Sequence, residues 1–522
     1  MPYCARINPV ANDEGLAPAR GRRDVPWALV TFSLATAVYL LTLSHDVGTF
    51  DVAEFQTIPH LFGVAHPTGY PLFTIIGGVW SWIPIGRVAT RMNLFSAVLF
   101  ASAASVLCSV GVRLRLRGAV SASAALTFAF ATGTWLNAVH VDVQSLHLLL
   151  VALLLLTWVV AYQDPRPRHI ALMCLVVGFG LVHHGLMIVT AAWVLALFVA
   201  CRWRAATRAA TLRLAIPALL LPLLTLLYLP LRDGSAPLLD ANPRRSWWQK
   251  IRGDGFRGTM GELRSLGIWG RAVGHHRELI SSWTGGGVLL LAVLGIGVLM
   301  RRAPAATWAI VGVGLLASYV QANAADSNDR YILTTVLALC LLASIGADAV
   351  IDAVAAVVPP RRLAVTSAAL VALFALLPLN GLRANYQSLD AHAIRRNERN
   401  GLDVLRSLPK SCVLWAYWDL RTELFYLRYV EHVRPDVTIL DHRSTEFLGS
   451  SFAVSATSLV DGLESAPAYR GRPICFVPLP GRSVSSSTVK ATVLTTTERP
   501  WGLSYLTPGA VYVLEHNRLG EA

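Results

Sequence analysis

Long apolar runs, separated by short basic segments, dominate the chain between residues 27 and 380. Several of them reach the roughly 17–25 residues that a membrane-spanning helix needs. The pattern therefore predicts a mostly α, polytopic membrane protein with about eleven transmembrane helices. The predicted spans are 27–43, 92–112, 118–136, 145–162, 170–184, 186–201, 212–231, 284–300, 305–322, 331–351 and 362–380.

A further apolar run, at 70–85, decides the orientation of every later span. The run is short, ends near Pro84 and contains Trp80 and Trp82, which favour the membrane interface. If it crossed the membrane, the arginine cluster at 113–117 and the later clusters would lie outside. A helix along the membrane surface places them all inside, as the positive-inside bias requires. The sequence thus predicts an interfacial helix within a first external loop at 44–91.

The pattern changes after residue 382, where the apolar runs shorten and charged residues become more frequent. Helix-like and strand-like runs alternate there, which is typical of a small α/β domain. The expected elements are 400–408, 412–417, 421–432, 436–440, 473–478 and 509–515. The predicted organisation is a cytoplasmic N-terminal tail at 1–24, a transmembrane domain at 25–382 and an extracytoplasmic α/β domain at 383–522.

Composition and charge narrow the class of protein. Of the 522 residues, 54% are hydrophobic and 15% are charged, and the net charge is +14. The basic excess lies in arginine clusters between apolar runs, which is typical of a membrane protein and argues against a nucleic-acid partner. The arginine- and alanine-rich composition favours a multi-pass protein of the bacterial inner membrane. Its N-terminus is expected in the cytoplasm.

The seven cysteines form no CxxC pair and no Cys/His cluster, so a zinc site is not expected. Cys412 and Cys475 both lie in strand-like runs of the region 383–522. A disulfide between them is one interpretation. Two separate buried thiols are the favoured one.

The first external loop gathers acidic and histidine side chains. Asp51 and Glu54 are three residues apart in FDVAEF and would share one face of a helix. A carboxylate suits the removal of a proton from an acceptor hydroxyl, whereas a solvated pair or a helix cap is the alternative. His66 begins the segment HPTGYP and is a candidate phosphate donor or helix cap. The turn itself, whose backbone proline and glycine fix, is interpreted as a scaffold.

Other candidates lie where later spans end. Asp142, in WLNAVHVDVQSLH, would orient the acceptor or the sugar, or be a solvated loop tip. His183 and His184 interrupt an apolar hairpin and would hold a lipid phosphate or cap the membrane turn. No third metal ligand is evident beside them. Arg232 and Arg330 end spans on the predicted outer side, and they would bind a substrate phosphate or lipid headgroups.

The motifs of the first loop resemble a known family. FDxxEF, followed by GVAHPTGYPLF, resembles the signature of a multi-pass family of GT-C glycosyltransferases that includes the transmembrane protein O-mannosyltransferases. Supporting segments are RMNLFSA at 91–97, YLPLR at 228–232 and RPDV at 434–437. The resemblance extends over most of the chain.

This resemblance implies a GT-C fold and a sugar taken from a polyprenyl-phosphate carrier at the non-cytoplasmic membrane face. It implies that Asp51 is the catalytic base, that Glu54 supports it and that His66 lies at the matching turn. The chain departs from the family in the second loop, where Asp142 is followed by valine and glutamine, and the expected tyrosine is missing. The departure implies a different acceptor or sugar preference.

The sequence as a whole predicts an inverting membrane glycosyltransferase that moves a sugar, with mannose as one candidate, to a hydroxyl of a protein or glycan. Asp51 would deprotonate the acceptor, and Arg232, with Arg330 or His184, would hold the departing phosphate. No metal or other cofactor is required, since arginine supplies positive charge.

Two rival hypotheses remain open. One is a transporter or lipid flippase that uses the same acids for proton coupling. The other is an inactive scaffold that acts through 383–522. The acids lie in external loops rather than in the middle of spans, and no inverted repeat is visible, so the enzyme is favoured.

Overall fold

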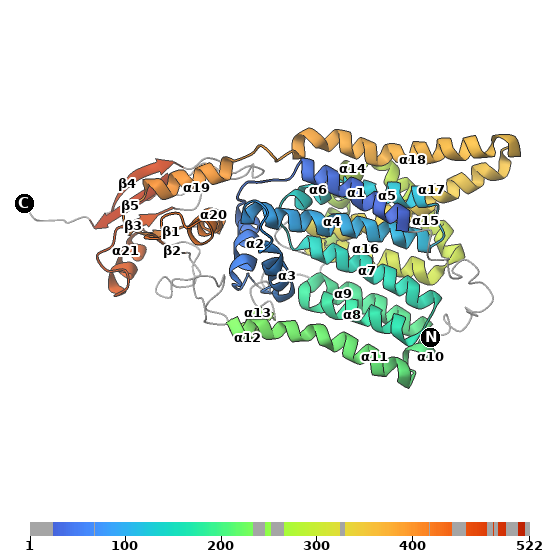
Figure 1. Cartoon of the computed structure of the whole chain (residues 1–522), viewed down its shortest axis with the longest axis horizontal. Helices are drawn as coiled ribbons and strands as arrows, with labels where there is room; N and C mark the ends of the chain where they lie inside the picture. The colour runs from blue at the N-terminus through green and yellow to red at the C-terminus, as the bar shows by residue number, and fades with distance from the viewer. Residues whose placement is uncertain are drawn as a thin grey trace, which may run out of the picture.

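The computed structural model describes residues 25–66, 68–232, 246–251, 266–323, 329–416, 418–440, 456–477, 484, 489–496 and 510–516. The predicted tail at 1–24 lies outside these ranges. Most of the long helices run side by side in a bundle, and a small sheet lies beyond one end of it (Figure 1). The bundle buries a continuous apolar core in which α4 packs against α1 and α7, and α17 against α15.

Each predicted span falls on helical segments of this bundle. The helices from the N-terminus to α9 are α1 Val25–Leu41, α2 Phe50–Leu61, α3 Pro71–Ser81, α4 Val88–Arg113, α5 Gly118–Ala129, α6 Thr132–Val139, α7 Gln144–Gln163, α8 Pro167–His183 and α9 Gly185–Cys201. Those that follow are α10 Trp203–Ala206, α11 Ala209–Leu220, η3 Leu221–Leu227, α12 Tyr228–Arg232, α13 Trp247–Ile251, α14 Leu266–Thr284, α15 Gly286–Arg302, α16 Pro304–Asn323, η5 Asp329–Ile332, α17 Leu333–Val357 and α18 Pro360–Leu389.

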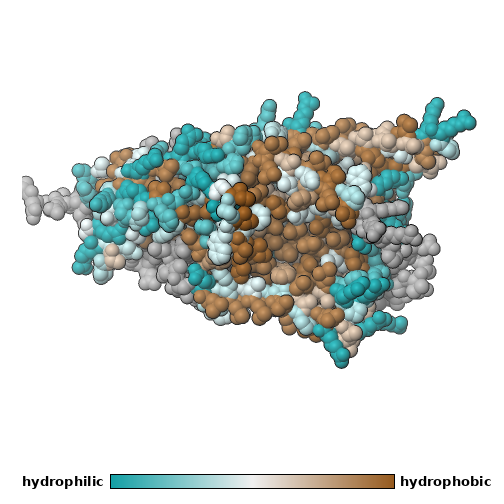
Figure 2. Space-filling model, viewed as in Figure 1, coloured by the Kyte–Doolittle hydropathy of each residue, from teal (hydrophilic) through white to brown (hydrophobic). Residues whose placement is uncertain are grey.

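The helices have the length and composition of a multi-pass membrane protein. In the described part of the chain, six helical segments are long and apolar enough to cross a membrane, or up to eight if each of two bent pairs is one span. The helices α1, α8 and α9 have 17 residues each, at the lower limit for a span. Hydrophobic residues cover much of the bundle, whereas hydrophilic residues cover the sheet end (Figure 2). The count of eleven spans stays a prediction.

The predicted single span at 118–136 is broken. The helices α5 and α6 meet at 67° around Phe130 and Ala131. Asn385 of α18 donates a hydrogen bond to the Phe130 carbonyl, 2.9 Å away, and accepts one from the Thr132 hydroxyl. The first bond gives the Phe130 carbonyl, at the break, a hydrogen-bond partner. Both bonds also show that α18 continues past the domain boundary predicted at residue 382.

The predicted interfacial run at 70–85 forms α3, which has 11 residues. A helix of this length rises only about 16 Å, too little to cross a hydrocarbon core. The preceding helix, α2, packs against both α3 and α20, a helix of the C-terminal part with bounds Trp418–Tyr429. Both α2 and α3 run across the direction of α4 and α7, at the bundle end that faces the sheet (Figure 1). This placement fits helices that lie along a membrane face.

The region after residue 382 contains a five-stranded sheet of order β2-β1-β3-β5-β4. The strand β1 pairs in parallel with β2 and β3, and β5 pairs antiparallel with β3 and β4. The strands are β1 Val413–Trp415, β2 Thr438–Leu440, β3 Ile474–Phe476, β4 Val489–Thr496 and β5 Ala510–His516, and the remaining helices are α19 Arg396–Ser407 and α21 Ala456–Ser465. Cys412 and Cys475 are buried free thiols, the favoured interpretation.

The first loop anchors this C-terminal part. The Asp46 carboxylate accepts hydrogen bonds from the backbone N–H groups of Asn397 and Glu398, each 3.0 Å away, at the start of α19. It thus caps a helix far along the chain. Arg87, just before α4, pairs with Glu398 at 2.7 Å and with Glu431 at 3.1 Å. Part of the acidity of the first loop is therefore structural.

Asp46 gives the folded protein a pH-dependent stability. Burial raises the pKa of its carboxyl from 3.8 to about 6, against the opposing effect of the backbone N–H groups. The folded state therefore binds this proton more tightly than the unfolded state. The stability that Asp46 contributes to the fold is thus fully present below about pH 4 and is lost as the pH rises through about 6. The full shift corresponds to about 3 kcal/mol. The unfolding temperature of the wild type should fall between about pH 4 and pH 8 relative to that of Asp46→Asn. The same pH dependence in both proteins would contradict this role of Asp46.

Candidate functional site

Arg330 joins the two acidic loops that the sequence singled out. Its Nη2 lies 3.0 Å from Oδ2 of Asp51, on α2, and its Nη1 donates to Oδ2 of Asp142, in the loop before α7. The Asp142 side chain is only 3% exposed, whereas those of Asp51 and Arg330 are 27% and 30% exposed. One cation is thus shared by a buried acid and an acid that solvent reaches. Within this cluster solvent reaches Asp51 and Arg330, whereas Asp142 is enclosed.

The two carboxylate oxygens of Asp142 have separate roles. Oδ1 accepts a hydrogen bond from the backbone N–H of Gln144, 2.8 Å away, and so binds the first turn of α7. Oδ2 receives the Arg330 guanidinium. The sequence alternatives were a substrate contact or a solvated loop tip. The structure instead shows a buried carboxylate that fixes both a helix start and the arginine.

Two buried amides hold the first loop against the second. Asn93 donates from Nδ2 to the Ser44 carbonyl at 2.8 Å, and its Oδ1 accepts from the Val141 N–H at 2.9 Å. Gln56, on the same helix as Asp51, donates to Asn93 at 3.2 Å and accepts from the Gly48 N–H at 2.9 Å. Because these bonds connect α2, α4 and the segment before Asp142, they fix the separation of the two acids.

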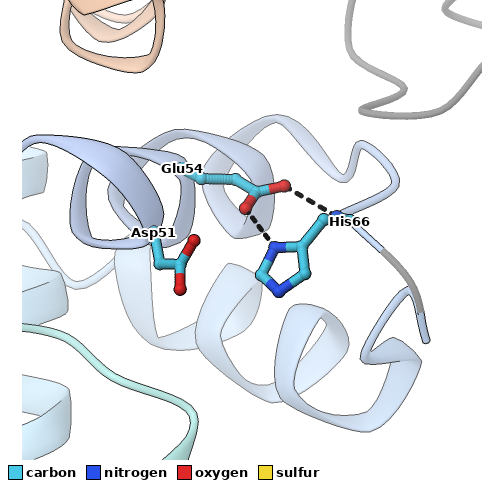
Figure 3. Close-up of side chains that lie close together, drawn as sticks. All are labelled: Asp51, Glu54 and His66. Carbon is cyan, nitrogen blue, oxygen red and sulfur yellow. Dashed lines mark hydrogen bonds and ion pairs between the residues drawn. The ribbon is translucent and has the colours of Figure 1, made fainter. Parts of the chain in front are cut away.

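Glu54 and His66 form a second pair beside Asp51. Glu54 is 3% exposed, and it accepts from the backbone N–H of His66 at 2.7 Å and pairs with His66 Nδ1 at 2.5 Å. Figure 3 shows the Asp51 carboxylate and the His66 ring on the same side of α2. Glu54 therefore orients the imidazole, while Asp51 faces the arginine.

Asp51, Glu54 and His66 also offer a possible set of metal ligands. One ligand atom from each residue lies within 4.8 Å of the others. Two carboxylates and an imidazole suit several divalent cations. Two of the three are already bonded to each other, so a cation would have to compete with the Glu54–His66 interaction.

His183 and His184 connect the turn between α8 and α9 to the start of α7. His184 caps α9, because its Nδ1 accepts from the Leu186 N–H at 3.2 Å. His183 places Nε2 3.0 Å from the Val143 carbonyl, and His184 places Nε2 3.1 Å from the Gln144 amide. The capping alternative of the sequence analysis is therefore present in the structure. A contact with a lipid phosphate stays a prediction.

Arg232 contacts the end of α2. Its Nε donates to the Phe62 carbonyl at 2.7 Å, and the Tyr228 hydroxyl donates to the Gly63 carbonyl at 2.7 Å. Both bonds attach α12 to the end of α2. The structure therefore brings Asp51, Glu54, His66, Asp142 and Arg330 together. A contact between Arg232 and a substrate phosphate stays a prediction.

The residue that sequence reasoning missed is Tyr70, in the turn interpreted as a scaffold. Its ring lies 5.3 Å from the ring of His66 and 6.3 Å from that of His184, measured between centroids. Asp51 and Arg330 are close enough to influence its charge state. The signal was the polar side chain within HPTGYP, which the proline and glycine pattern obscured.

Part of the chain, including most of this cluster, is similar to known proteins. Residues 51–207 match the family described as the Protein O-mannosyl-transferase TMEM260 N-terminal domain, and the match begins at Asp51. Protein O-mannosyl-transferase TMEM260 of Mus musculus is 26% identical over 474 residues, which are 82% of this chain and 65% of that protein. Its relative from Dictyostelium discoideum is 31% identical over 24% of the chain and 16% of its own length. The chain thus spans less than two thirds of these relatives.

Solved structures share the fold. ArnT from Cupriavidus metallidurans bound to undecaprenyl phosphate has a TM-score of 0.55 and 15% identity, over 94% of this chain and 98% of ArnT. The chain described here has the GT-C fold and resembles the TMEM260 family. The archaeal oligosaccharyltransferase AglB from Archaeoglobus fulgidus, in complex with an inhibitory peptide and a dolichol-phosphate, agrees with a TM-score of 0.53 at 11% identity. That similarity covers 86% of this chain and 69% of AglB. The GT-C resemblance seen in the motifs is thereby confirmed.

The TMEM260-like segment holds most of the cluster but not all of it. It includes Asp51, Glu54, His66 and Asp142. Arg330 lies more than a hundred residues after its end, and the bundle brings it back to the two acids. The cluster is therefore completed by a residue outside the matched segment.

Loss of the arginine should destabilise the protein through Asp142. Arg330→Met leaves a buried carboxylate without its cation, which costs about 3 kcal/mol or more. Adding Asp142→Asn should recover much of this loss, because the amide carries no charge and still accepts from the Gln144 N–H. Thermal unfolding of the single and double variants in detergent measures the coupling. Purely additive effects would show that the two side chains do not depend on each other.

Proposed function

We propose that this protein is a membrane glycosyltransferase that transfers a sugar from a polyprenyl-phosphate carrier to a hydroxyl of a protein or glycan. Asp51 is the general base, and mannose is the first candidate sugar because the relatives are named protein O-mannosyl-transferases. The site faces the non-cytoplasmic side of the membrane, and the arginine clusters support that orientation. A bacterial inner membrane is the proposed location.

The observation that carries the proposal is the solvent-reachable carboxylate of Asp51, held by Arg330 on a helix that runs across the end of the bundle. A lipid carrier presents its phosphate at the membrane surface, where such a helix lies. Two fold neighbours were solved with undecaprenyl phosphate and with dolichol-phosphate bound. These ligands share the chemistry of a polyprenyl monophosphate, which supports that class of donor here.

The reaction follows from the charges of the cluster. Asp51 takes the proton of the acceptor hydroxyl, and the acceptor oxygen attacks the anomeric carbon from the face opposite the phosphate, which inverts its configuration. The bond between that carbon and the phosphate oxygen breaks, and the phosphate leaves with the electron pair. Arg330 stabilises the growing negative charge, and Asp142 keeps the guanidinium in place.

The position of the acids favours transfer over transport. Proton coupling in a transporter would need acids along the spans. The acids Asp51, Glu54 and Asp142 gather at the sheet end of the bundle. On α17, Asp348 and Asp352 pair with Arg117, and these pairs account for their charge.

Replacing Asp51 by asparagine should stop transfer and leave the fold intact. The amide is nearly the same size and still accepts a hydrogen bond from Arg330, but it cannot take a proton. We expect a loss of at least about 10²-fold in turnover, in an assay of purified protein with a panel of polyprenyl-phosphate sugars. The matched control is Asp403→Asn, since the Asp403 side chain is 72% exposed on α19. Undiminished transfer by Asp51→Asn would contradict the role of base.

The proposed chemistry needs no metal, because Arg330 supplies the positive charge. Transfer should therefore continue at the same rate after treatment with a strong chelator. If activity disappears and Mn²⁺ or Mg²⁺ restores it, the set Asp51, Glu54 and His66 becomes the metal site instead. Glu54→Gln then separates a metal-free site from a metal site, because it should weaken transfer far more if transfer depends on a metal held by Glu54.

A further inference from the structure

Tyr70 has a backbone conformation that tyrosine rarely adopts. The residue precedes α3 with φ 43° and ψ 51°, in the left-handed region that side chains with a Cβ avoid. Gly69 before it has φ 83°, and a Cβ there would lie 2.8 Å from a methyl group of Leu229. Such strain persists only where the surroundings fix it, and it is concentrated at functional sites.

The ring of Tyr70 is locked by its neighbours. It meets the ring of Phe55 edge-on, with 5.5 Å between centroids and 82° between planes, and the ring of His66 at 5.3 Å and 70°. His183 and His184 lie behind it, with ring centroids 6.2 and 6.3 Å away. The whole residue is only 7% exposed. The hydroxyl therefore has little freedom to change direction.

The hydroxyl itself has no hydrogen-bond partner among the described residues. The oxygen is not one of the buried polar atoms that lack a partner, so solvent or a ligand can reach it. Asp51, Arg330, Asp142 and Tyr331 all influence its ionisation, so it lies next to the charged cluster. Burial raises the pKa of the phenol well above its usual value, and the group remains a neutral donor at physiological pH.

We propose that Tyr70 is a further catalytic residue, whose hydroxyl donates a hydrogen bond to the phosphate of the polyprenyl-phosphate donor. This inference rests on the proposed function. The strained backbone, the locked ring and the unused donor beside Arg330 together assign it this role. Tyr70 and Arg330 then approach the phosphate from two different segments of the chain.

The contact strengthens as the reaction proceeds. The acceptor proton passes to Asp51, the acceptor oxygen bonds to the anomeric carbon, and the electron pair of the breaking carbon–oxygen bond moves onto the phosphate. Tyr70 keeps its proton throughout and only donates a hydrogen bond. Because the phosphate becomes more negative, this bond favours the transition state and the product over the bound donor.

Tyr70→Phe removes the hydroxyl and keeps the ring and its packing. We expect kcat to fall by about 10²-fold, with the donor KM within about threefold of the wild type and an unchanged unfolding temperature. Tyr228→Phe is the control, since it removes a hydroxyl that donates to the Gly63 carbonyl and lies beside Arg232. It should lower the unfolding temperature slightly and leave kcat within about twofold. A Tyr70→Phe enzyme with wild-type kcat would overturn the inference while the proposed function stands.

A binding measurement separates this failure from failure of the proposed function. Undecaprenyl phosphate without a sugar is titrated into the purified protein in detergent and followed by native mass spectrometry. Tyr70→Phe should bind it about tenfold more weakly or worse, and Tyr228→Phe should bind it like the wild type. Equal binding by all three overturns the role of Tyr70, even if no sugar transfer is found. Wild-type protein that neither binds this lipid nor transfers a sugar would overturn both proposals.

Discussion

The guanidinium of Arg330 holds the candidate site together. It bonds Asp51 across 279 residues of sequence and Asp142 across 188. A cation at the end of an apolar bundle is costly unless acids compensate it, and each acid here also needs the cation. The cluster of these three side chains therefore forms only when the first loop, the second loop and η5 meet.

The rest of the fold keeps that meeting point rigid. Buried amides tie α2 to the bundle on one side, through Gln56 and Asn93. On the other side α2 packs against α20, while Asp46 and Arg87 bind α19 and its neighbours. A catalytic group on a helix braced from both sides can be held within the small tolerance that chemistry requires. This gives the C-terminal part a structural role in addition to any contact with the acceptor.

The hydrophobic pattern predicted where helices lie along the chain, because apolar runs of span length have few alternatives in a membrane. The spacing of Asp51 and Glu54 correctly placed both on one helix, but the structure gives them different partners, which spacing does not reveal. The break at Phe130 depends on Asn385, about 250 residues away, and no local signal marks it. The strand β4 was missed because its threonines resemble a polar loop.

Tyr70 shows most clearly that local sequence does not reveal contacts made in the tertiary structure. Its importance comes from a left-handed backbone and from rings that two other segments supply, Phe55 on α2 and the histidines between α8 and α9, and none of these can be read from HPTGYP. Asp46 lies in the same loop as Asp51 and Glu54, and only its contact with α19 shows that it is a helix cap. Sequence thus indicated the class of chemistry and most of the acids, whereas partners and orientation required the tertiary structure.

The most direct test of the account is a structure of the protein in lipid nanodiscs with a non-hydrolysable polyprenyl-phosphate sugar, determined by cryo-electron microscopy. The account predicts that the donor phosphate lies within hydrogen-bond distance of Arg330 and the Tyr70 hydroxyl. Asp51 should then face the side of the anomeric carbon opposite that phosphate. A donor bound elsewhere in the bundle, with the Asp51–Arg330–Asp142 cluster closed and untouched, would contradict it.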